Sequence, residues 1–152
     1  MKAFAVDAAV LAQAKDIIAQ GAPCVFLEEG RIAAPGQGKG VQPLLTALRE
    51  QPEQLKKQAV IDKIVGKAAA MLCVLGKVQG VYAMTISRSG AEYLAAYGVP
   101  FSYEKMVEYI ENRTGDGMCP MEAAVQTLSD PEEGAAALRE TLARLRGLAS
   151  KT

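Results

Sequence analysis

The segment AVIDKIVGKAAAMLCVLGKV, residues 59–78, changes from a β-branched apolar run to an alanine-rich apolar run at Gly66. β-branched side chains favour strands, and alanine favours helices. The segment therefore begins with a short β-branched run and predicts a helix over about 65–75, which Gly76 ends. Few polar residues follow Lys67, so we expect this helix to be buried on nearly all sides.

The next two segments extend this pattern along the chain. GVYAMTIS, residues 80–87, is a continuous apolar run of the kind that forms a buried central strand. RSGAEYLAAYG, residues 88–98, predicts an amphipathic helix with Ser87 or Ser89 as its N-cap and Gly98 at its end. Alternating strands and helices indicate parallel strands joined by crossover helices.

Toward the N-terminus, residues 5–20 have apolar side chains at helical spacing, and Gly21 follows as the helix end. CVFLEEGRIAA, residues 24–34, predicts a β-hairpin with a glycine in its turn. Residues 35–54 predict a glycine-rich loop and a short helix that Pro52 closes.

Toward the C-terminus, residues 99–110 predict a strand and one or two helical turns. Residues 119–130 and 131–148 predict the final helices, the second capped by Asp130 and packed on its own domain. The predicted order is α, β-hairpin, α, α, β, α, β, α, α. Such an order gives a three-layer α/β/α sandwich with a mixed sheet.

Length and charge set the broad class. We expect one domain over residues 1–152, with a tail at 149–152 that frays. Seventeen basic residues balance seventeen acidic ones, so no field favours nucleic acid or an anionic membrane. Charges interrupt the N-terminal apolar residues, and no uncharged stretch is long enough to span a bilayer. A cytoplasmic protein is expected.

The cysteines and histidines limit the chemistry. Cys24, Cys73 and Cys119 are widely spaced and form no C-x-x-C pair, which argues against a disulfide framework or a zinc knuckle. Histidine is absent, which excludes His-dependent triads and most catalytic zinc sites. No cofactor and no metal are expected.

Two motifs carry a family resemblance. DKIVGKAAA, residues 62–70, and NRTGDGMCPME, residues 112–122, combine glycine and charge at fixed spacing. With GVQPLL, residues 40–45, they resemble an uncharacterised prokaryotic domain-of-unknown-function family whose fold is similar to cytidine deaminase. The likeness covers about residues 41–133 and implies a deaminase-like domain. It implies no reaction.

The deaminase comparison can be tested on the helix starts. Zinc deaminases place a His or Cys ligand and a glutamate on one helix, and a P-C-x-x-C pair on the next. The corresponding starts here, GKAAA and SRSGA, contain no thiolate, imidazole or carboxylate. We therefore expect no zinc and no zinc-dependent deamination, while helix N-termini still point at a pocket on the carboxyl edge of the sheet.

This pocket is the first candidate site. Gly66 lets a ligand approach the backbone, the following helix offers free N–H groups, and Lys67 adds a positive charge. Ser87 opens the next helix and provides further donors, and Asp62, which begins the DKIVGKAAA motif, is included among the ligand-binding candidates. The alternative is structural: Gly66 permits close packing, Lys67 is solvated and Ser87 is a cap.

The NRTGDGMCPME motif is the second candidate site. Cys119 precedes Pro120 and is the expected N-cap of a helix, and Glu122 is expected to fold back on that cap. The helix dipole would favour a thiolate, as a nucleophile requires. A capped helix with a glycine-rich turn is the structural alternative, and a cation held by Asp116 and Glu122 is a third. The ligand-binding candidates in this motif are Asn112, Arg113, Thr114, Gly117, Cys119 and Glu122.

The sequence thus predicts a small-ligand-binding protein whose ligand is an anion, either a nucleotide or another phosphorylated metabolite. One alternative is a thiol-dependent enzyme or redox protein that uses Cys119. Another is a structural homo-oligomer without ligand, and a homo-oligomer, most simply a dimer, is expected in any case. Whether a reaction is catalysed stays open.

Overall fold

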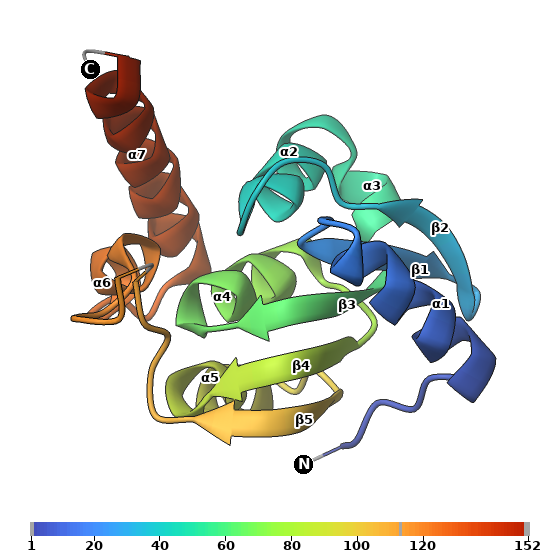
Figure 1. Cartoon of the computed structure of the whole chain (residues 1–152). Coiled ribbons are helices and arrows are strands. Elements are labelled where there is room, and N and C mark those ends of the chain that lie inside the picture. Colours follow the sequence, from blue (N-terminus) through green and yellow to red (C-terminus); the bar gives the residue numbers. More distant parts are fainter. Residues whose placement is uncertain (1, 113, 151–152) are drawn as a thin grey trace.

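The computed structural model describes residues 2–112 and 114–150, and these build a five-stranded mixed sheet with helices on both faces (Figure 1). The strand order is β2-β1-β3-β4-β5. β1 is antiparallel to β2 and β3, whereas β3, β4 and β5 are parallel to one another. The strands are β1 (Cys24–Glu28), β2 (Arg31–Pro35), β3 (Gln58–Val65), β4 (Val81–Ser87) and β5 (Phe101–Val107).

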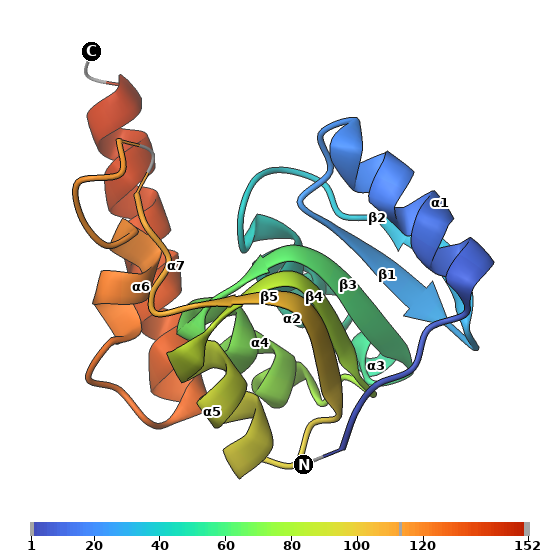
Figure 2. The ribbon, with the colours of Figure 1, turned by 60° about the horizontal axis from the view of Figure 1, so that its bottom comes forward.

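The helices divide between the two faces of the sheet (Figure 2). α1 contacts β1, β2 and β3 on one face, which we call the α1 face. On the other, the α4 face, α4 contacts β3 and α5 contacts β4 and β5, while α7 packs on α4 and α6. The helices are α1 (Ala8–Ala19), α2 (Gln42–Glu50), α3 (Pro52–Leu55), α4 (Lys67–Gly76), α5 (Arg88–Ala96), α6 (Pro120–Val125) and α7 (Pro131–Ser150).

Two hydrophobic clusters hold the layers together. Val60 on β3 joins the α4 cluster and its neighbour Ile61 joins the α1 cluster, because successive side chains of a strand point to opposite faces. The α4 cluster is the larger, and it includes all six residues from Ala68 to Cys73. Helix α4 is therefore buried on nearly all sides, as its sequence predicts.

The α/β class, the mixed sheet and the hairpin are confirmed. The hairpin turn has positive φ angles at Glu29 (52°) and Gly30 (77°), which gives a tight connection between β1 and β2. The strand β3 is missing from the predicted order, although a β-branched run was recognised there. The strand β3 has eight residues and pairs with β1 on one side and with β4 on the other.

Two local predictions are wrong. Residues 108–110 form no helical turn, and the chain leaves β5 as an irregular segment. Pro52 does not close a segment but begins α3, where a proline at the first position needs no N–H partner. The helix α4 ends at Gly76 as predicted, and Lys77, which follows it, takes the left-handed conformation (φ 56°).

The α1 face is covered over only part of the sheet. α1 lies over β1, β2 and β3, and Ile64, near the end of β3, stays 44% exposed on this face. A complete third layer therefore stays a prediction.

At the C-terminus, α7 continues through residues 149 and 150, where a frayed tail was expected, and 151–152 lie outside the described residues. Within the described chain, no helix is both long and apolar enough to cross a bilayer.

Candidate functional site

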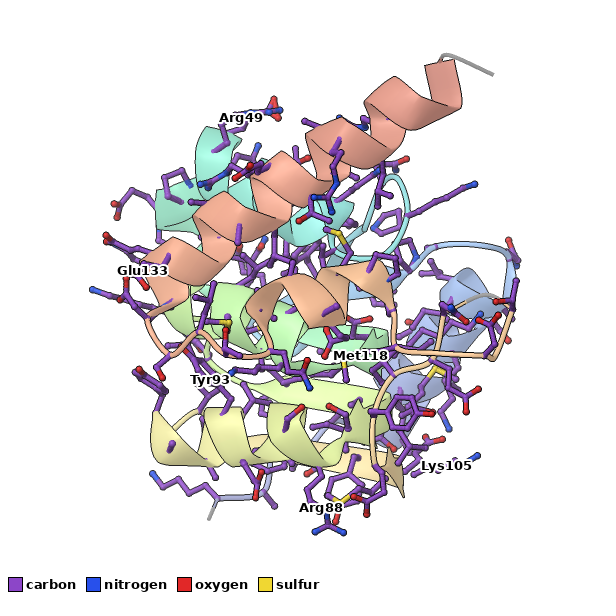
Figure 3. All side chains as sticks on the ribbon, turned by 90° about the vertical axis from the view of Figure 1, so that its left-hand side faces the viewer. Arg49, Arg88, Tyr93, Lys105, Met118 and Glu133 are labelled. Atoms are coloured by element: carbon purple, nitrogen blue, oxygen red, sulfur yellow. The ribbon has the colours of Figure 1, made fainter. Side chains whose placement is uncertain are left out.

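The parallel strands β3, β4 and β5 end at one edge of the sheet, which we call the carboxyl edge (Figure 3). α4 begins directly after Gly66, and α5 begins directly after Ser87. The two helix starts are closely packed, because a Cβ at Gly90 would lie 3.0 Å from the carbonyl oxygen of Val65. The sequence therefore placed both helix starts correctly at this edge.

Glu122 occupies the N-terminus of α4. Its two carboxylate oxygens accept hydrogen bonds from the backbone N–H of Lys67 (2.7 Å) and of Ala68 (3.0 Å). A Cβ at Gly66 would lie 2.2 Å from Oε1 of Glu122, so a glycine is needed here to admit the carboxylate. The expectation that Glu122 folds back on the cap of its own helix is wrong. The carboxylate instead caps a helix that is 55 residues away in the sequence.

Burial outweighs hydrogen bonding in the electrostatics of Glu122. Burial raises the pKa of this carboxyl, while the N–H groups of Ala68 and Lys67 and the positive charge of Lys67 oppose the rise. A carboxylate is also favoured at a helix N-terminus by the helix dipole. The donors that we expected to bind an external anion are therefore bound to a side chain of the same protein.

The other predicted residues of this edge are also engaged. Ser87 is fully buried and caps α5 by accepting a hydrogen bond from the N–H of Gly90 (3.0 Å). The Lys67 ammonium donates to the carbonyl oxygen of Gln126 (3.1 Å). The structure thus brings Gly66, Lys67, Ser87 and Glu122 together, but it shows their polar groups in contacts within the chain.

Asp62 lies below this edge, buried on the α4 face. Its Oδ1 accepts a hydrogen bond from the N–H of Ile64 (3.2 Å). Burial raises the pKa of Asp62 to about 7, although hydrogen bonds from the backbone of Ile64 and Lys63 oppose the rise. Burial also raises the pKa values of the nearby Cys24 and Cys73 thiols, and the carboxylate of Asp62 adds to both shifts.

Residues 111–112 and 114–118 form a turn held by hydrogen bonds among its own residues. Asn112 Nδ2 and Thr114 Oγ1 both donate to Oδ1 of Asp116, at 2.9 and 2.6 Å. Hydrogen bonds from Thr114 and Asn112 lower the pKa of the exposed Asp116 carboxyl. The N–H of Asn112 donates to the carbonyl oxygen of Gly117 (2.8 Å). Arg113 lies outside the described residues.

Cys119 is the N-cap of α6, as predicted. Its thiol is free and half-buried, and in the described part of the chain the side chain makes no capping hydrogen bond. Its backbone N–H donates to the carbonyl oxygen of Ile110 (2.9 Å). Cys119 therefore has a side chain whose role the local structure does not explain.

A groove of about 460 Å³ opens on the α1 face of the carboxyl edge, and we call it the edge groove. Its floor is a row of Cα partners across the three parallel strands, formed by Ile64, Thr85 and Lys105. Its wall is the segment 107–111 that leaves β5, including Tyr109, which is 45% exposed. Among the described residues no ion pair involves Lys105.

The residues of the edge groove are not among the site residues predicted from the sequence. The sequence does contain a signal for this site, because ligands of open α/β sheets bind outside the carboxyl ends of parallel strands. Thr85 and Lys105 lie near the ends of two predicted strands.

Within residues 2–112 and 114–150, no group of three or more Cys, Asp or Glu side chains is placed to hold a metal ion.

A family model described as TM1506, domain of unknown function (DUF1893), matches residues 13–142. The chain belongs to this family. It is also similar to the crystal structure of a DUF1893 family protein, TM1506 from Thermotoga maritima, with 28% sequence identity, a TM-score of 0.75 and 95% coverage of each chain. No curated protein matches the chain. The family match extends beyond the expected 41–133 at both ends.

Asp62→Asn should change how stability depends on pH. The folded-state pKa of Asp62 is raised from 3.8 to about 7, so the neutral form fits the fold better, and stability falls as pH rises through this window. A tenfold change in proton affinity is worth about 1.4 kcal/mol, so the ionised carboxyl costs up to about 4 kcal/mol. The isosteric asparagine cannot ionise. Urea denaturation from about pH 4 to about pH 8 should show the free energy of unfolding of Asp62→Asn rising relative to that of the wild type. A difference that stays constant with pH would contradict the prediction.

Gly66→Ala should displace the Glu122 carboxylate, because the new Cβ would lie 2.2 Å from Oε1. We expect a loss of about 1–3 kcal/mol in the free energy of unfolding. In Glu122→Ala, which removes the obstructing carboxylate, the same substitution should cost much less. A double-mutant cycle by urea denaturation measures this coupling, and additive losses would show that the two residues do not meet.

Proposed function

We propose that this DUF1893 protein binds a small anionic ligand, a nucleotide or another phosphorylated metabolite, in the edge groove. The observation that carries the proposal is Lys105, which forms no ion pair with any described residue, beside an exposed Tyr109 at the carboxyl end of the parallel strands. Lysine binds phosphate as a point charge, and a tyrosine ring provides a stacking surface for a base. Glu108, also in the wall, is neutralised by an ion pair with Arg88 (2.7 Å).

We propose that the ligand contacts the edge groove and not the helix N-termini that the sequence predicted. The N–H groups of Lys67 and Ala68 bind Glu122, and the hydroxyl of Ser87 binds the N–H of Gly90, so an external phosphate would have to displace these partners. The residues at the two helix starts then affect the ligand indirectly, because they set the structure of the carboxyl edge. They are Gly66, Lys67, Ser87 and Glu122. A cytidine-deaminase-like fold is part of the proposal, supported by two adjacent helix starts at the carboxyl edge.

Lys105→Ala should weaken nucleotide binding by about tenfold, the effect of losing one charge-assisted hydrogen bond that is partly exposed to water. Isothermal titration with a panel of nucleotides, the matching uncharged nucleosides and inorganic phosphate measures this. Lys57→Ala, at the opposite end of β3, is the control and should bind like the wild type. If no member of the panel binds the wild type, the protein has no such site.

A second candidate function rests on Cys119. Its thiol is half-buried and free, and no capping role in the described structure accounts for it. A thiol-dependent enzyme or redox protein would place a nucleophile at this helix start.

Alkylation with peptide mapping should modify Cys119 in the native protein, while the buried Cys24 and Cys73 stay unmodified. Burial raises the pKa values of the latter two thiols, so they carry little thiolate at neutral pH. Cys119→Ser should keep the stability of the wild type. Equal and slow alkylation of all three thiols would remove the enzyme hypothesis.

A further inference from the structure

The wall of the edge groove is one arm of a hairpin formed by residues 110–112 and 114–119, which we call the wall hairpin. The carbonyl oxygen of Ile110 accepts a hydrogen bond from the N–H of Cys119 (2.9 Å), and Glu111 forms an antiparallel bridge with Met118. The wall therefore cannot move without the return arm. Figure 3 shows Met118 on this return arm, beside α6.

The return arm runs directly into α6, which is fastened to α4. Glu122, in the first turn of α6, binds the N–H groups of Lys67 and Ala68. Further along, Val125 is fully buried and the carbonyl oxygen of Gln126 accepts a hydrogen bond from the Lys67 ammonium (3.1 Å). The position of the wall thus follows from the attachment of α6 to α4.

The attachments differ in strength. The Arg88–Glu108 ion pair at the start of the wall joins two exposed side chains, and pairs of this kind contribute little. Glu122 is buried, and hydrogen bonds from backbone N–H groups to a carboxylate are about twice as strong as neutral ones. Gly66 leaves room for this carboxylate, because a Cβ there would overlap its oxygens.

We propose that Glu122 is the positioning residue of the edge groove: by clamping α6 to the first N–H groups of α4, it sets the distance of the wall hairpin from the Ile64–Thr85–Lys105 floor. The inference rests on the proposed function, because it assigns Glu122 a role in ligand affinity without ligand contact. Glu122 is absent from the lining of the groove. Its loss should widen the groove, while the charge that selects the ligand stays in place.

The prediction concerns affinity and selectivity together. Glu122→Ala should weaken nucleotide binding by about tenfold, because a binding group displaced by a fraction of an ångström loses its contacts. The preference for a nucleotide over its nucleoside should stay unchanged, since Lys105 is retained. Lys105→Ala should reduce that preference. Titration of both variants with the same nucleotide and nucleoside measures the affinity for the nucleotide and its preference over the nucleoside.

The matched control is Asp130→Ala. Asp130 caps α7 by accepting a hydrogen bond from the N–H of Glu133 (3.1 Å), so its loss also uncaps a helix, but α7 carries no part of the groove wall. This variant should bind nucleotide as the wild type does. If Glu122→Ala does not fold, Glu122→Gln, which keeps one acceptor oxygen, replaces it and should show a smaller change in the same direction.

Hydrogen exchange provides a readout that does not require a ligand. Amides of the wall hairpin, including those of Asn112 and Cys119, should exchange faster in Glu122→Ala and at the wild-type rate in Asp130→Ala. Unchanged exchange together with wild-type affinity would overturn the inference. If the wild type binds no nucleotide, the proposed function fails, and the exchange rates alone decide whether Glu122 holds the wall.

Discussion

The contact between the Glu122 carboxylate and the first two N–H groups of α4 determines how the carboxyl edge is built. It requires a glycine at position 66, because a Cβ there would overlap the carboxylate oxygens. It also requires α6 to approach α4 from a distant part of the chain, and the burial of Val125 stabilises that approach. The hairpin that precedes α6 is positioned as a consequence, and with it the wall of the edge groove.

This contact also decides where an external ligand can bind. A helix N-terminus at the carboxyl edge normally offers its N–H groups to an anion. Here the start of α4 is satisfied by Glu122 and the start of α5 by Ser87. The polar groups left for a ligand lie on the opposite face, where α1 does not reach and the ammonium of Lys105 has no partner among the described ion pairs. The open part of the α1 face is therefore where the proposed ligand finds polar groups that are not already bound within the described structure.

The sequence predicted local structure well and long-range partners poorly. The alanines after Gly66 predicted α4, and Pro120 predicted the start of α6, whereas the β-branched run before Gly66 did not lead to a predicted strand. Glu122 was correctly selected as a capping residue, but the capping rules describe contacts within one helix. They cannot indicate a partner 55 residues away. Lys105 was not selected because neighbouring strands define its environment, and the row of Ile64, Thr85 and Lys105 exists only once three strands are in register.

The two buried carboxyls of this edge show how the same burial can have different consequences. Burial raises the pKa of both Asp62 and Glu122. Glu122 receives two backbone hydrogen bonds at a helix N-terminus with a lysine ammonium nearby, so its negative charge is stabilised where it lies. Asp62 lies inside the sheet beside two thiols, with the N–H of Ile64 as its hydrogen-bond donor at 3.2 Å, and its pKa of about 7 makes the neutral acid the favoured form below that pH. Glu122, both of whose oxygens accept backbone hydrogen bonds, is therefore part of the contact that organises the edge, whereas the carboxyl of Asp62 below it fits the core best as a neutral group.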